Sequence, residues 1–199
     1  MRKLCFYLML LSTNASGQSL LISGDYNGEL KLAYDKNTKQ VTGFYDSSTG
    51  VDEKTGNPKF TCVFYIEGKL LKNKATIESY YPLDTTIIRG ELIVDAKEIK
   101  IHLNSEQGGC WNVQPFTDGS ATFSMDESKQ WIQVRYAIRD RVYFYSEKKE
   151  SSKNKSYILK GNIVYIEKID QDWAYCSYFG KRTTKGWIKV NELNQLKSR

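Results

Sequence analysis

The stretch Lys155–Leu193, KSYILKGNIVYIEKIDQDWAYCSYFGKRTTKGWIKVNEL, contains four short runs rich in β-branched and aromatic residues. Turn residues separate the runs, as in Lys160-Gly161-Asn162 and Asp170-Gln171-Asp172. Such runs favour strands, and short turns between them are typical of antiparallel hairpins. The stretch therefore predicts a small antiparallel barrel, with strands at Tyr157–Leu159, Ile163–Ile169, Trp173–Phe179 and Thr184–Val190.

The order of residues in this stretch is more specific than the spacing. A Lys-Gly-Asn turn precedes an alternating strand, Trp173 opens the next strand, and Gly186-Trp187-Ile188 leads to a final Asn-Glu-Leu. This order resembles the bacterial SH3-like domain, and Arg141–Ser146 (RVYFYS) fits the first strand of that family. The resemblance covers about residues 140–196 and departs from the family at Cys176, where valine is common.

The resemblance implies an aromatic groove, with basic side chains nearby, that binds peptidoglycan, another anionic wall polymer or a protein partner. Aromatic rings beside basic groups can also stack on nucleic-acid bases, but we expect no nucleic-acid partner for an exported chain. An alternative places Trp187 and Ile188 in the core, and we expect it to hold for at least one of the two tryptophans. The candidate groove residues are Tyr143, Tyr145, Trp173, Tyr175, Tyr178, Lys181, Arg182 and Trp187.

Upstream of this module, about eight short strand-like runs follow one another with turns between them. Their number and spacing are typical of an up-and-down barrel or a closed β-sandwich. Thr38–Gly50 loosely resembles a strand-and-turn stretch of calycin-type barrels, and Ser47–Lys59 is expected to be a polar loop. The whole chain is thus expected to be all-β, with runs at Leu20–Tyr34, Lys39–Asp46, Phe60–Glu67, Ala75–Tyr81, Ile87–Val94, Glu98–Leu103, Ala121–Met125 and Gln130–Ile138.

The first 17 residues, MRKLCFYLMLLSTNASG, have the order of a secretory signal. Arg2 and Lys3 precede an apolar run of eight residues, Leu4–Leu11, and small residues follow at Ala15-Ser16-Gly17. The run is too short to span a membrane; the alternative is a core strand or helix at the N-terminus. We therefore expect a signal peptide at 1–17, a barrel or sandwich domain at 18–139 and an SH3-like domain at 140–196, exported to the periplasm or beyond.

Charge is unevenly distributed between the two expected domains. Residues 18–139 hold 14 basic and 16 acidic side chains, a net charge of −2, whereas residues 140–199 hold 13 basic and 7 acidic ones, a net charge of +6. A basic exported module is steered toward acidic partners. The alternative is a solvated, lysine-rich surface.

Three cysteines follow the expected signal. Cys62 and Cys110 both lie in the first domain and are the natural disulfide pair in an oxidising compartment, which leaves Cys176 as a small buried thiol. The pair would fix the loop Glu106–Phe116, whose residues Gly108, Gly109, Trp111 and Asn112 could bind a partner. The alternative is that Trp111 covers one end of the barrel.

Catalytic and metal-binding patterns are weak in this sequence. His102, the single histidine, is expected to be a half-exposed strand residue, and no spacing of Cys or His predicts a metal site. Acid pairs such as Asp52/Glu53 and Asp126/Glu127 are expected in solvated turns. We expect no cofactor and no metal.

Three functions stay open. The first is an exported, monomeric, non-enzymatic protein whose SH3-like module binds the cell wall or a protein. The second is an inhibitor or immunity protein that blocks a wall-degrading enzyme through residues 106–116. The third, least favoured, is a hydrolase that uses loop carboxylates, which would have to face each other across a cleft.

Overall fold

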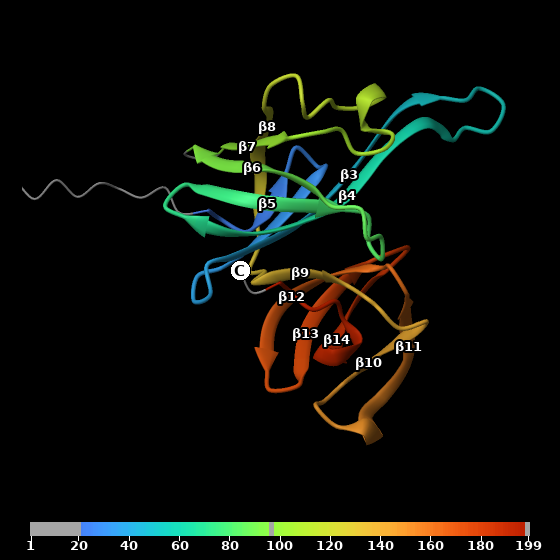
Figure 1. The fold of residues 1–199 in the computed structure, drawn as a ribbon. Helices are drawn as coiled ribbons and strands as arrows, with labels where there is room; N and C mark the ends of the chain where they lie inside the picture. Colours follow the sequence, from blue (N-terminus) through green and yellow to red (C-terminus); the bar gives the residue numbers. More distant parts are fainter. Residues whose placement is uncertain (1–20, 96–97, 198–199) are drawn as a thin grey trace, which may run out of the picture.

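A computed structural model describes residues 21–95 and 98–197. The chain is all-β, as predicted, and forms two sheets that pack against each other (Figure 1). The first is a closed barrel of eight antiparallel strands, which settles the choice between barrel and sandwich. Its strands are β1 (Gly24–Tyr26), β2 (Leu30–Asp35), β3 (Gln40–Val51), β4 (Pro58–Leu71), β5 (Lys74–Tyr80), β6 (Ile88–Asp95), β7 (Glu98–Leu103) and β8 (Ala121–Ser128).

Each barrel strand pairs with its neighbour in sequence, and β8 closes the barrel by pairing with β1. Alternate side chains of every strand point inward, so apolar residues at every second position fill the interior. Tyr45, Phe64, Phe116 and Phe123 are all buried there, and their rings contact one another at centroid distances of 5.1–6.2 Å. The barrel interior is therefore a packed aromatic core.

The second sheet has six strands in the order β11-β10-β14-β13-β12-β9. One face packs on a core that includes Val142, Phe144, Ile166, Cys176 and Ile188. The free thiol of Cys176 is buried in this core, as predicted. The strands are β9 (Gln133–Tyr136), β10 (Arg141–Tyr145), β11 (Lys153–Leu159), β12 (Ile163–Asp170), β13 (Trp173–Phe179) and β14 (Thr183–Lys189), with short helices η2 (Glu150–Ser152) and η3 (Val190–Glu192).

The assignment of Gln130–Ile138 to the barrel is wrong. Within that range, β9 pairs with β12 of the second sheet, from Tyr136 opposite Ile163 to Gln133 opposite Ile166. Figure 1 shows β9 between the barrel and the rest of the second sheet. The strand thus lies between β12 and the barrel, because its residues Val134 and Tyr136 belong to the apolar cluster that packs against the barrel. The second sheet thus begins before residue 140.

The polar stretch Ser47–Lys59 was also expected to be a loop, and most of it is strand. β3 and β4 stay paired from Ser47 opposite Cys62 out to Val51 opposite Pro58. We call this extension, residues 47–62, the arm; Figure 1 shows it reaching out beyond the barrel. Both faces of the arm are solvated near its tip, so a polar composition does not distinguish it from a loop.

Candidate functional site

The loop between β7 and β8 is fixed to the barrel by covalent and polar contacts. The predicted disulfide between Cys62 of β4 and Cys110 of the short helix η1 (Cys110–Asn112) is present. A single carboxylate oxygen of Glu106 accepts hydrogen bonds from the main-chain N–H groups of Phe116 and Thr117. Buried Gln107 donates to Ser79 Oγ at 2.9 Å. These contacts hold the loop in one conformation.

Gly109, one of the predicted loop residues, is required by the backbone at this point. Its φ angle is +82°, a conformation that other residues adopt only with strain. A Cβ atom at this position would lie 2.4 Å from the carbonyl oxygen of Thr61. Its neighbour Gly108 accepts a hydrogen bond from the hydroxyl of Tyr81. Gly109 thus lets η1 approach the arm closely.

Trp111 is 61% exposed, whereas Phe116 of the same loop is fully buried among the barrel's aromatic rings. The alternative in which Trp111 covers the end of the barrel is therefore wrong, since Phe116 occupies the interior. Asn112 is exposed beside Trp111. A large apolar ring held in water by a fixed loop is typical of interaction sites.

The arm adds further exposed apolar side chains next to this loop. Phe60 is 43% exposed and lies two residues from Cys62, so both project from the same face of β4. The disulfide places Cys110 on that face, and Trp111 follows Cys110 directly. Val51, near the tip, is 63% exposed. We call Val51, Phe60 and Trp111 together the tryptophan surface.

The second sheet carries a separate aromatic surface on the side opposite its core. Tyr145, Trp187 and Tyr175 are opposite one another across β10, β14 and β13. Trp173 lies two residues before Tyr175 and contacts the Tyr145 ring at 4.9 Å in an edge-to-face arrangement. Tyr175 and Trp187 form a second edge-to-face pair at 5.4 Å. We call these four residues the aromatic face; Tyr145 is buried and the others are half-buried. Ile188 lies in the core, but the expectation that at least one of Trp173 and Trp187 lies there is wrong.

Lysines lie over the rings of the aromatic face. The ammonium groups of Lys148 and Lys168 are 5.6 and 6.0 Å from the centre of the Trp187 ring, and that of Lys189 is 6.0 Å from Trp173. Lys148 also pairs with Asp170, and Lys189 pairs with Glu150. The hydrogen bonds from these lysines lower the pKa values of both carboxyl groups. The face therefore combines apolar rings with lysines, two of which are held in ion pairs.

The four other predicted residues are not part of the aromatic face. Tyr178 packs against the core side of the sheet, while Lys181 and Arg182 are exposed in the β13–β14 turn. Tyr143 lies two residues before Tyr145, on the same side of β10, but its ring contacts Tyr157 of the edge strand β11 at 5.6 Å in a tilted arrangement, with Lys153 3.6 Å from the Tyr143 ring centre. Tyr178, Lys181 and Arg182 therefore do not share a groove with the aromatic face.

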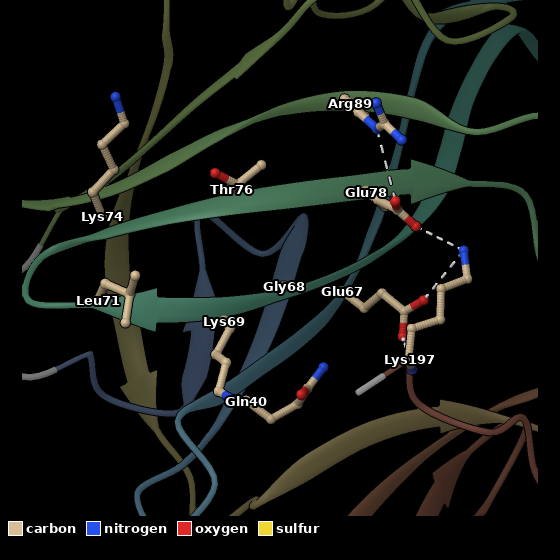
Figure 2. A pocket seen from close by; sticks show the side chains of 10 residues that line it. All are labelled: Gln40, Glu67, Gly68, Lys69, Leu71, Lys74, Thr76, Glu78, Arg89 and Lys197. Atoms are coloured by element: carbon tan, nitrogen blue, oxygen red, sulfur yellow. Dashed lines mark hydrogen bonds and ion pairs between the residues drawn. The ribbon is translucent and has the colours of Figure 1, made fainter. Parts of the chain in front are cut away.

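A pair of buried carboxylates is the feature that sequence reasoning missed. Glu67 of β4 and Glu78 of β5 are opposite each other on the outer wall of the barrel, and Lys197 from the C-terminal tail lies against both (Figure 2). The only local sign of this pair in the sequence was Glu67, which follows the apolar run of its strand. Of the acid pairs expected in solvated turns, Asp52/Glu53 lies at the tip of the arm, with Asp52 half-buried, whereas Asp126/Glu127 is exposed but belongs to strand β8. His102 is a half-buried strand residue, as expected.

Comparison of the chain with protein-family models, curated proteins and solved structures gave no match in any of the three. No helix within residues 21–95 and 98–197 is long and apolar enough to cross a membrane. Over the same ranges, no three His, Cys, Asp or Glu side chains gather in a way that could hold a metal ion. The expected signal peptide lies outside the described residues.

Proposed function

We propose that this chain is an exported, non-enzymatic binding protein that engages a protein partner through the tryptophan surface. The observation that carries the proposal is the 61% exposure of Trp111 on a loop fixed by the Cys62–Cys110 disulfide. Tryptophan is enriched among the residues that dominate binding energy at protein interfaces. A loop that is already ordered loses little entropy when it binds, which favours affinity.

The shape of this region favours a concave partner. The arm extends beyond the barrel (Figure 1), and it carries the exposed side chains Phe60 and Val51. A projecting apolar surface fits a cleft better than a flat face. An enzyme cleft is such a site, and this supports the role of an inhibitor or immunity protein for a wall-degrading enzyme.

The test uses the chain from residue 18 and a panel of purified wall-degrading hydrolases. We expect one of them to be inhibited, and Trp111→Ala to weaken its binding by about 30-fold, as for a residue worth about 2 kcal/mol. Leu71→Ala is the matched control, because Leu71 is 72% exposed elsewhere on the barrel. Unchanged affinity of Trp111→Ala for a partner of the wild-type chain would exclude this surface.

A second candidate function, docking on an anionic wall polymer, is favoured by the aromatic face. Its rings can stack on sugars, and the lysines over them can pair with carboxylate or phosphate groups. The net charge of +6 over residues 140–199 acts in the same direction. The SH3-like resemblance agrees with this role.

Co-sedimentation with purified peptidoglycan tests the second candidate. We expect the wild-type chain to sediment at low salt, and Trp173→Ala with Tyr175→Ala to remain in solution. Trp111→Ala serves as the control, since it leaves the aromatic face intact and should sediment normally. Failure of the wild-type chain to sediment at any salt concentration would exclude this role and leave the protein partner as the proposal.

A further inference from the structure

A groove of about 490 Å³ lies on the outer wall of the barrel, over β4, β5 and β6. Gly68 of β4 lies between its two ends (Figure 2). Glu67, Glu78 and Arg89 are at one end of the groove, and Leu71 and Lys74 are at the other. It is separate from the tryptophan surface and from the aromatic face.

The carboxylates at one end are more buried than acidic side chains on a barrel exterior usually are. Glu67 is 3% exposed and Glu78 is 8% exposed, and they are opposite each other in the β4–β5 pairing. Like charges at directly opposed positions destabilise a sheet unless a cation lies between them. Tyr80 donates a hydrogen bond to Glu67 at 3.0 Å, and Arg89 lies 3.8 Å from Glu78. The site is thus built to receive positive charge.

The cation between them comes from the last residues of the chain. The Lys197 ammonium group is 2.7 Å from an oxygen of Glu78 and 3.7 Å from one of Glu67. It also lies 5.1 Å from the centre of the Tyr80 ring. The main-chain N–H of Lys197 donates to the second oxygen of Glu67 at 3.3 Å. The two carboxylates and the Tyr80 ring together provide the contacts that an alkylammonium group needs.

Lys197 reaches the site from a tail that is fixed three residues earlier. Asn194 is buried and exchanges two hydrogen bonds with the main chain of Tyr136, at 2.9 and 3.0 Å. Gln195 after it is exposed, and the Lys197 side chain keeps 39% of its surface in solvent. Withdrawal of Lys197 therefore leaves the core of the second sheet and its anchor at Asn194 unchanged.

We propose that the groove is a binding site for the lysine side chain of a peptide ligand, and that Lys197 occupies it as an internal competitor. The contacts of Lys197 indicate how the site would bind a lysine of a peptide. The ammonium group would contact both carboxylates, and the main-chain N–H of that lysine would donate a hydrogen bond to Glu67. The length of groove beyond Glu67, past Gly68 to Leu71, receives the residues next to the ligand's lysine. Self-occupancy lowers the apparent affinity, which equals the intrinsic affinity multiplied by the fraction of molecules whose tail has withdrawn.

The experiment is an NMR titration of the chain from residue 18, followed at the amides of Gly68 and Thr76. The probes are n-butylammonium and Nα-acetyl-lysine methylamide, with n-butanol and sodium chloride as blanks. In Lys197→Ala we expect both ammonium probes to give saturable shifts, with affinity about tenfold above wild type because the competitor is gone. The lysine derivative should bind more tightly, since it alone reproduces the N–H contact with Glu67.

The isosteric change Glu67→Gln, added to Lys197→Ala, should abolish the shifts while the rest of the spectrum keeps its native dispersion. Leu159→Ala on the Lys197→Ala background is the matched control, because Leu159 is 52% exposed on β11, outside the groove, and this variant should keep the response. Equal responses of wild type and Lys197→Ala, or no saturable response in either, would overturn the proposal. Binding of n-butylammonium at least as tight as that of the lysine derivative would assign the site to free amines, and so reject a peptide lysine. These outcomes do not depend on the tryptophan surface.

Discussion

Tyr65 of the barrel donates a hydrogen bond from its hydroxyl to the main-chain carbonyl of Val134 in the second sheet, at 2.8 Å. Both residues are fully buried. The N–H of Val134 donates in turn to the hydroxyl of Thr42 at 2.7 Å. Trp131, Tyr136 and the barrel residue Tyr80 complete the apolar cluster around them. The two sheets therefore share one buried interface, and these two hydrogen bonds join them across it.

Removing the Tyr65 hydroxyl should weaken that interface. Tyr65→Phe leaves the ring in place and deprives the buried Val134 carbonyl of a donor, so we expect a loss of about 1–2 kcal/mol in the free energy of unfolding. Urea unfolding followed by circular dichroism measures it. Tyr157→Phe is the control, because Tyr157 is 44% exposed. An equal effect of both changes would show that the buried hydrogen bond contributes nothing.

The disulfide should contribute strongly to the stability of the barrel. It closes a loop with a sequence separation of 48, and Cys62→Ser with Cys110→Ser should lower the free energy of unfolding by about 2–4 kcal/mol. Under non-reducing conditions, the mass of the chain from residue 18 should be lower than that of the reduced chain by two hydrogens. Cys176 should resist alkylation until the protein unfolds, because it is buried and burial raises the pKa of its thiol. Three reactive thiols in the native chain would contradict this prediction.

The pKa of Glu67 should report on the groove. Burial raises this pKa above its ordinary value of 4.5, while the N–H and charge of Lys197 and the hydroxyl of Tyr80 partly oppose the rise. We therefore expect Lys197→Ala to raise the Glu67 pKa further, measured from the carboxyl ¹³C shift against pH. A lower pKa in this variant would contradict the contacts drawn in Figure 2.

The raised pKa of Glu67 also determines how the free energy of unfolding should change with pH. Because the pKa is higher in the folded than in the unfolded chain, the contribution of Glu67 to stability is complete below pH 4.5 and is lost as the pH rises through the folded value. Glu67→Gln should remove this decline from the profile of unfolding free energy against pH. A profile with the same slope in both proteins would show that Glu67 titrates normally.

A fragment that begins at Asp140 should be less stable than one that begins at Gln130. The shorter fragment lacks β9, which leaves the edge of β12 unpaired and uncovers Tyr165. Thermal unfolding of the two fragments should show a lower midpoint for the shorter one. Equal midpoints would mean that β9 contributes only to the contact with the barrel.

The sequence alone determined the features that depend on neighbouring residues. Alternating apolar and polar residues gave most of the strands and the all-β class, because side-chain direction alternates within a single strand. The Cys62–Cys110 pair and the buried thiol of Cys176 were also predictable, since only two cysteines fall in the first domain. The aromatic face was predictable because Trp173 and Tyr175 lie two positions apart in one strand.

Only the tertiary structure decided the features that join distant parts of the chain. β9 alternates like a barrel strand, yet it pairs with β12, and no local pattern distinguishes the two partners. Trp111 and Phe116 are both aromatic residues of one loop. Which of them enters the barrel interior depends on the space that remains inside the closed barrel, and Phe116 occupies it. Lys197 meets Glu67 across 130 positions. Such pairings depend on which surfaces remain open after the barrel has formed, and that information is spread over the whole fold.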